Sequence, residues 1–195
     1  MSKKIVFIHG SPRKNGNTRA ISSIAVQAAL DKKADVVEID ATKLAFEIPG
    51  CISCMKCHQS DEFGCVIGDQ LAQTVATLIK YDVIVVATPT YWMSYTAQIK
   101  MLIDRMGSLI KFTESGEIQT PLAGKVMAIL ATGNAGLENN LDLLEHQWKS
   151  VADMMSCQFN SCLFPNAPIE AGALKNDPAA LKKAKEFGQL LASSH

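Results

Sequence analysis

Short runs of apolar, mostly β-branched residues recur along this chain and alternate with longer stretches of helical spacing. The runs predict five strands, at residues 5–8, 36–39, 83–87, 126–131 and 158–163. The longer stretches predict helices over residues 18–32, 70–80, 96–107, 140–155 and 178–192, with Thr18 and Asp177 as caps. Val83–Ala87 is almost continuously hydrophobic, which indicates a strand covered on both faces. The alternation predicts an α/β fold with a doubly wound parallel sheet and helices on both faces.

Length and composition narrow this picture further. A chain of 195 residues with 48% hydrophobic content is expected to form a single domain over residues 1–195. Nineteen basic residues balance nineteen acidic ones, so we expect no nucleic-acid partner and no membrane surface as partner. The N-terminus lacks a signal-peptide pattern and no run is long enough to span a bilayer, which predicts a cytoplasmic protein.

A polar loop, Gly10–Thr18, lies between the first predicted strand and the first predicted helix. A helix N-terminus after a buried strand directs backbone N–H groups and a positive dipole end at an anion. The loop lacks the lysine of a Walker A loop and the glycine triplet of a dinucleotide fingerprint. It suits a terminal monophosphate, with donors from Ser11, Arg13, Asn17 and Thr18; the alternative is a solvated turn capped by Thr18.

Two further turns follow predicted strands. Pro89, Thr90, Tyr91, Trp92 and Met93 make an aromatic-rich turn after the third strand, which predicts contact with a planar heterocycle, and the alternative is an aromatic cap over the core. The fourth strand ends in a turn whose glycines permit close backbone approach, formed by Thr132, Gly133, Asn134, Ala135 and Gly136. Because carboxyl ends of parallel strands meet at one sheet edge, all three turns are expected to converge there.

The motifs at 10–18, 88–92, 103–105 and 132–136, taken in order, resemble those of the flavodoxin-like NAD(P)H-dependent FMN reductases. The resemblance covers nearly the whole chain and implies a five-stranded sheet of order 2-1-3-4-5. It implies that the FMN phosphate is held by Ser11, Arg13, Asn17 and Thr18. It implies that the isoalloxazine ring is lined by Pro89, Thr90, Tyr91, Trp92 and Met93, and faced at its far edge by Thr132, Gly133, Asn134 and Gly136. It also implies a homodimer or homotetramer in which the neighbour helps form the pocket.

For such a protein the chemistry belongs mainly to the flavin, which accepts hydride from NADH or NADPH and passes electrons to a small-molecule acceptor. Quinones, flavins and metals are acceptors of this kind. No catalytic protein residue is therefore expected. His9, beside the phosphate loop, is interpreted as a structural histidine.

Four cysteines cluster in the long connection at residues 41–69 with the spacing C-x₂-C-x₂-C-x₇-C. Cys51, Cys54, Cys57 and Cys65 supply four soft ligands, which suit an iron–sulfur cluster or tetrahedral zinc. Their spacing resembles that of the iron–sulfur flavoproteins, which implies the alternative function of a [4Fe–4S] flavoprotein exchanging electrons with ferredoxin-like partners. Free or redox-active thiols remain a third interpretation, in which Lys56 lowers a neighbouring thiol pKa.

The remaining features are less specific. Cys157 and Cys162, at the last strand, are interpreted as small buried hydrophobes. A second long connection at residues 108–124 predicts a flap or short hairpin, or else a plain surface excursion.

Overall fold

The computed structural model describes residues 2–193 and contains a five-stranded parallel sheet in the order β2-β1-β3-β6-β7. The strands are β1 (Lys4–His9), β2 (Asp35–Asp40), β3 (Val83–Pro89), β6 (Val126–Thr132) and β7 (Gln158–Phe164). These are the five predicted strands, and their order is the predicted one once the two short strands of an excursion are set aside. The predicted doubly wound fold is therefore confirmed.

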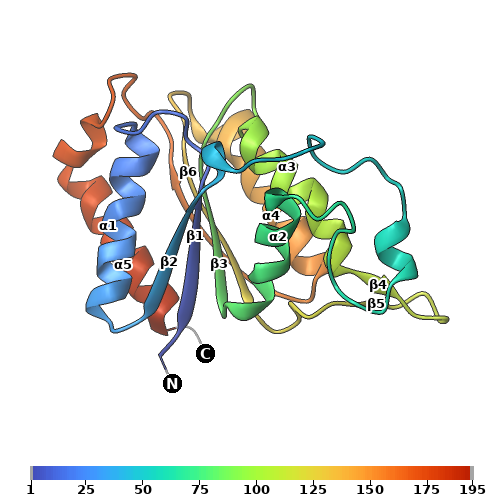
Figure 1. The fold of residues 1–195 in the computed structure, drawn as a ribbon. Coiled ribbons are helices and arrows are strands. Elements are labelled where there is room, and N and C mark those ends of the chain that lie inside the picture. The colour runs from blue at the N-terminus through green and yellow to red at the C-terminus, as the bar shows by residue number, and fades with distance from the viewer. Residues whose placement is uncertain (1, 194–195) are drawn as a thin grey trace.

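Helices cover both faces of the sheet (Figure 1). One face is covered by α1 (Asn17–Asp31) and α5 (Pro178–Ser193). The other is covered by α2 (Gln70–Thr77), α3 (Ala97–Arg105) and α4 (Asp142–Met154). Two separate apolar cores result, one on each face. The central strand β6 is buried at all seven positions, whereas the edge strand β2 has none fully buried, as expected when only a central strand is flanked on every side.

Short helical segments lie in the connections between these elements. They comprise η1 (Ala41–Lys43), η2 (Lys56–Gln59), η3 (Leu78–Lys80), η4 (Met106–Leu109), the kinked turn η5 (Leu137–Leu141) and η6 (Ala173–Asn176). The predicted hairpin is present, as β4 (Lys111–Phe112) paired antiparallel with β5 (Ile118–Gln119). The connection that carries the four cysteines swings away from the sheet beyond α2 and lies near this hairpin (Figure 1).

The predicted caps have different outcomes. The carboxylate of Asp177 accepts hydrogen bonds from the backbone N–H groups of Ala179 and Ala180, so the cap of α5 is confirmed. The Thr18 cap is wrong, because α1 begins one residue earlier and the Thr18 hydroxyl is instead 2.6 Å from the hydroxyl of Thr132. Among the described residues, no helix is both long and apolar enough to cross a membrane.

Candidate functional site

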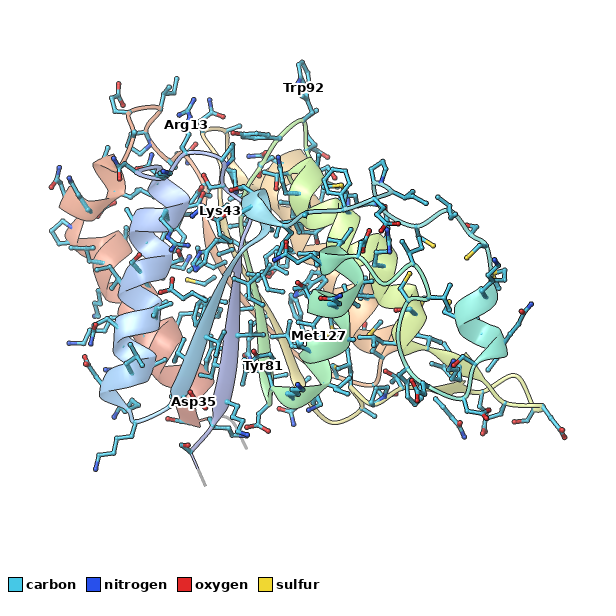
Figure 2. The ribbon with its side chains drawn as sticks, viewed as in Figure 1. Arg13, Asp35, Lys43, Tyr81, Trp92 and Met127 are labelled. Atoms are coloured by element: carbon cyan, nitrogen blue, oxygen red, sulfur yellow. The ribbon has the colours of Figure 1, made fainter. Side chains whose placement is uncertain are left out.

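The carboxyl ends of the parallel strands surround a cavity of about 220 Å³. Figure 2 shows Arg13 and Trp92 at this edge, with Asp35 and Tyr81 at the opposite one. The lining comes from four loops, after β1, β3, β6 and β7: Ser11, Arg13, Gly16, Asn17, Thr18, Pro89, Thr90, Tyr91, Thr132, Gly133, Asn134, Ala167, Pro168 and Ile169. The structure thus brings the three predicted turns together at one edge.

The loop after β1 is fixed in place by the sheet and by α3. The Gly10 N–H donates to the carbonyl of Ala87 in β3 at 2.8 Å. A Cβ built on Gly10 would stand 2.2 Å from Ile99 Cγ1, so the close approach of α3 requires glycine here. Gly16 precedes α1 in an extended conformation, and no described side chain caps that helix. The first turn of α1, whose N–H groups have no partner within the helix, therefore lies at the wall of the cavity.

The polar side chains of this loop divide into two kinds. The Asn17 side chain is hydrogen-bonded to the chain after β7. Its amide nitrogen donates to the carbonyls of Pro168 and Glu170, and its amide oxygen accepts from Leu174 N–H. Thr18 is occupied by Thr132, as described above. The side chains of Asn17 and Thr18 therefore hold the loop in place, and both residues line the cavity. The side-chain hydrogen bonds of Ser11 and Arg13 are longer, at 3.3 to 3.4 Å.

Arg13 is the one charged side chain among the described residues that line the cavity. It is exposed, and its Nη1 donates to the carbonyl of Ile169 at 3.3 Å. No carboxylate of the described chain forms an ion pair with it. An exposed guanidinium without a carboxylate partner, beside a helix N-terminus, makes this part of the cavity suited to an anion.

The aromatic turn is sharply bent. Trp92 and Met93 both have positive φ, at 49° and 56°, and Tyr91 and Ser94 exchange backbone hydrogen bonds across them. The turn therefore directs Trp92 outward, with 92% of its surface exposed, as Figure 2 also shows. Of the five predicted ring contacts, Pro89, Thr90 and Tyr91 line the cavity, whereas Trp92 and Met93 lie outside the lining.

Thr90 carries an unsatisfied polar atom. Its Oγ1 is buried and has no hydrogen-bond partner within residues 2–193, although Thr90 N–H donates to the carbonyl of Thr132. A buried hydroxyl left without a partner costs about 1–3 kcal/mol. Because Thr90 lines the cavity, a polar ligand group is the natural partner for this hydroxyl.

The turn after β6 completes the lining. Thr132, Gly133 and Asn134 line the cavity, and Gly136 does not. A Cβ on Gly133 would stand 2.8 Å from the amide nitrogen of Asn140, so the turn is packed against η5. Sequence reasoning missed the loop after β7, which contributes Ala167, Pro168 and Ile169. The available signal was positional, because this loop also follows the carboxyl end of a parallel strand.

His9 has the structural role expected for it. Its Nε2 is 2.8 Å from a Glu38 carboxylate oxygen, and its Nδ1 is 3.3 Å from the Ser22 hydroxyl. Burial, reinforced by the charge of Arg19, lowers its pKa from 6.5 to about 4 in spite of Glu38 and Asp40. The imidazole is therefore neutral at pH 7 and does not add a charge to the phosphate loop.

The four clustered cysteines line a second cavity, of about 90 Å³. Its remaining lining comes from the same connection and from the end of α3: Ile52, Ser53, Met55, His58, Val66, Ile67, Arg105, Gly107 and Ser108. Gly50, Ser53 and Met55 all have positive φ, so the backbone bends repeatedly around the sulfurs. Sequence reasoning identified the thiols but not the polar residues that face them.

The neighbouring thiols affect the pKa of Cys57. Burial raises the pKa of Cys57, and the neighbouring Cys65, Cys51 and Cys54 raise it further. The expectation that Lys56 lowers a neighbouring thiol pKa is therefore wrong for Cys57. Within residues 2–193, no three Cys, His, Asp or Glu side chains stand in the arrangement of a metal site.

Arg105 ties the cysteine segment to the body of the protein. Its guanidinium is 1% exposed and lies 3.1 Å from an Asp69 carboxylate oxygen. It also donates to the carbonyls of Gly50 and Ile48 and, at 3.1 Å, to the sulfur of Cys65. Burial alone would raise the pKa of Asp69, but hydrogen bonds from Ala72 and Glu47 N–H and the Arg105 charge hold it below its usual value.

The two remaining cysteines lie away from this cavity. Burial raises the pKa of Cys157 to about 11 and that of Cys162 to about 12, so both stay protonated at neutral pH. Cys162 is buried, as predicted, whereas Cys157 is only partly buried and donates its S–H to the carbonyl of Leu122.

Comparison with solved structures supports the fold alone. An NAD(P)H:quinone oxidoreductase from Methanothermobacter marburgensis superposes with a TM-score of 0.71 at 13% identity, covering 98% of this chain and 100% of that one. An FMN-dependent NADH-azoreductase from Bacillus anthracis, solved in complex with FMN, gives a TM-score of 0.73 at 11% identity, covering 97% and 100%.

Sequence comparison is more specific. An iron–sulfur flavoprotein of Methanosarcina thermophila is 32% identical over 163 residues, which cover 81% of this chain and 78% of that protein. Another, from Methanocaldococcus jannaschii, is 28% identical over 198 residues, which cover 97% and 95%. The family model described as NADPH-dependent FMN reductase matches residues 3–166. This chain therefore belongs to the NADPH-dependent FMN reductase family, whose likeness the loops at the sheet edge had indicated.

Proposed function

We propose that this protein is an FMN-dependent oxidoreductase that takes hydride from NADH or NADPH and delivers electrons to a small-molecule acceptor. The observation that carries the proposal is the cavity at the sheet edge. It is lined by Arg13, whose guanidinium has no carboxylate partner among the described residues, and by Thr90, whose buried hydroxyl has no hydrogen-bond partner there. FMN has a phosphate for the first and ring heteroatoms for the second. When bound, it supplies the hydride-accepting chemistry.

The chain's own residues would bind and orient the cofactor. We assign the phosphate to the N-terminal end of α1, where Ser11 and Arg13 offer side-chain donors and Asn17 and Thr18 offer the helix backbone. We assign the edge of the isoalloxazine ring to Thr90 and to the backbone of the turns at 89–93 and 132–136. No proton donor or acceptor of the protein is required for hydride transfer.

The test is an anaerobic titration. Purified protein, reconstituted with FMN, is mixed with NADH or NADPH, and the flavin absorbance is followed before a quinone is added. We expect bleaching by at least one nicotinamide and recovery of colour with the quinone. Bound flavin that neither nicotinamide reduces would overturn the hydride-transfer assignment, while failure to bind FMN would overturn the site as well.

A second candidate function is supported by the second cavity. Four cysteines line one cavity, and two of their sulfurs accept hydrogen bonds: Cys65 from Arg105 and Cys51 from Ser53 N–H. Four thiolates spread around a cavity suit a [4Fe–4S] cluster, in which each cysteine binds a different iron, better than a single zinc ion, which needs its ligands drawn to one point. We therefore propose that Cys51, Cys54, Cys57 and Cys65 hold such a cluster, for electron exchange with ferredoxin-like partners.

Iron and sulfide content of anaerobically purified protein decides this second candidate. We expect both elements and a broad visible absorbance that Cys54→Ala abolishes. Cys157→Ala, which alters a cysteine outside the cavity, is the matched control and should keep the iron. Protein with FMN but without iron, after anaerobic reconstitution with iron and sulfide, would leave only the first proposal standing.

We also propose that residues 1–195 form one FMN-binding domain that assembles as a homodimer or homotetramer. Support comes from the exposed apolar side chains beside the first cavity, where Trp92 is 92% and Ile169 is 68% exposed. Light scattering after size-exclusion chromatography measures the assembly. A monomer at micromolar concentration would contradict it.

A further inference from the structure

Two residues with polar side chains line the second cavity besides the cysteine loop. They are Arg105, at the end of α3, and Ser108, in η4. Both side chains are almost completely buried, at 1% and 4% exposure. A guanidinium and a hydroxyl are costly to place in such a position unless something accepts their hydrogen bonds.

Arg105 has acceptors, whereas Ser108 has none. The Ser108 Oγ is buried and has no hydrogen-bond partner among residues 2–193. The Nδ1 of His58, which lines the same cavity, is in the same situation. Two residues of the described chain that carry an unpartnered buried polar atom thus line one small cavity, alongside four cysteines. Such groups indicate a ligand with acceptor atoms.

The sulfurs already receive hydrogen bonds from the protein. Arg105 Nη1 donates to Cys65 Sγ at 3.1 Å, and the Ser53 N–H donates to Cys51 Sγ at 3.4 Å. The charge of Arg105 is largely balanced by Asp69, 3.1 Å away, so its effect on the cavity comes mainly through this hydrogen bond. Ser108 lines the same cavity, and its unpartnered hydroxyl is a donor without charge.

We propose that the Ser108 hydroxyl donates a hydrogen bond to a sulfur of the iron–sulfur group held by the four cysteines, and that Ser108 and Arg105 together raise its reduction potential. This inference rests on the proposed cluster. The reduced cluster carries one more negative charge than the oxidised one, so a donor to sulfur stabilises the reduced form more. Both residues are positioning residues, since they act through the sulfurs.

Ser108→Ala is the test. It removes a buried hydroxyl and breaks no hydrogen bond of that hydroxyl within the described chain. We expect the variant to keep its iron, sulfide and FMN. At a fixed potential, its ratio of reduced to oxidised cluster should fall about three- to tenfold, which corresponds to a midpoint lower by about 30–60 mV at 59 mV per tenfold for one electron. The flavin midpoint, measured in the same titration, should not move.

Two further variants make the result specific. Ser108→Thr keeps the hydroxyl and is expected to keep the parental cluster potential. Ser150→Ala removes an exposed hydroxyl on α4, whose Oγ bonds the carbonyl of His146, and should leave both midpoints unchanged. Should the alanine variant lose its iron while the threonine variant retains it, the hydroxyl is required even more strongly than proposed.

The failures are distinguishable. Wild-type protein without iron after anaerobic reconstitution overturns the cluster and this inference together. Iron-loaded protein in which Ser108→Ala leaves the cluster midpoint unchanged overturns the inference alone. A threonine variant shifted as far as the alanine variant also overturns it, because the hydroxyl would then not be the cause.

Discussion

The two cavities of this protein are built by different means. The first lies where strands end, and its position follows from the sheet: four loops leave parallel strands at one edge and must converge. The second lies in a connection outside the sheet, which is held by side-chain hydrogen bonds: buried Arg105 binds it to α3, and Lys111 of β4 donates to the carbonyls of Cys57 and Ser60. We therefore expect a site set by the topology of the sheet to tolerate the loss of single contacts better than a site held by a few side-chain hydrogen bonds.

The largest effect is expected from removing Arg105, whose guanidinium is buried beside Asp69. Arg105→Met leaves the Asp69 carboxylate buried at 4% side-chain exposure without its cation, which typically costs about 3–5 kcal/mol of unfolding free energy. We expect loss of iron binding and faster cleavage of residues 41–69 in limited proteolysis, with FMN binding retained. Urea unfolding measures the stability.

Arg105→Met/Asp69→Asn is the matched control. It removes the stranded charge while keeping an oxygen to accept from Ala72 N–H, so it should recover part of the lost stability. Equal losses of FMN and iron in the single variant would contradict the independence of the two cavities.

A pH-dependent effect of comparable size is expected at His9, the last residue of β1. The folded-state pKa of His9 is about 4 against 6.5 when unfolded, so the unfolded chain takes up the proton first as the pH falls. The contribution of neutral His9 is full above pH 6.5 and is lost progressively between pH 6.5 and 4. It amounts to about 3 kcal/mol.

Urea unfolding at pH 7.0, 5.5 and 4.5 measures this loss, with His9→Gln as the comparison variant. Glutamine keeps a donor toward Glu38 but does not titrate, so its curve should be flatter over this interval. If the two proteins lose stability in parallel, the burial of a neutral His9 is not what makes the sheet edge sensitive to acid.

Arg13→Ala sharpens the comparison at the level of binding. The substitution removes the one charged group that the described residues contribute to the first cavity, and a charge-assisted hydrogen bond is worth about 1.5–3 kcal/mol. FMN should therefore bind about ten- to a hundredfold more weakly, with no change in iron content. Fluorescence titration of FMN measures this, and Lys14→Ala, which alters the adjacent exposed cation, should bind as the parent does.

The smallest effect is expected at Trp92. Because this side chain is 92% exposed and lies outside the cavity lining, Trp92→Ala should change unfolding free energy by less than about 0.5 kcal/mol. In the isolated chain, Tyr91→Ala should weaken FMN binding more than Trp92→Ala does. The reverse ranking would mean that the outward tryptophan reaches the cofactor, and the same titration distinguishes the two.

The sequence predicted the sheet well because its signal is local. Each central strand is a short apolar run, and burial on both faces leaves no ambiguity about which residues are inside. The order of the loops along the chain then placed ten of the thirteen predicted site residues at one cavity. The prediction needed no distances, because loops that follow parallel strands meet at one edge of the sheet.

The remaining features depend on long-range contacts that no local pattern carries. Trp92 and Met93 point outward because both adopt left-handed backbone conformations, which a bulky side chain rarely does. Asn17 binds carbonyls about 150 residues away, and Arg105 binds one 55 residues away. The sequence shows that these side chains have donors, but only the packed chain determines which acceptors they meet.

Arg105 also has a consequence for the entropy of the cysteine segment. By holding the carbonyls of Ile48 and Gly50, the sulfur of Cys65 and the carboxylate of Asp69, it acts as a noncovalent cross-link across the base of the loop. The chain between Gly50 and Cys65 is thereby closed at its two ends before any ligand enters, so the cost of loop closure falls on folding and not on binding. A ligand of the four thiols then meets a segment whose conformational freedom has already been reduced.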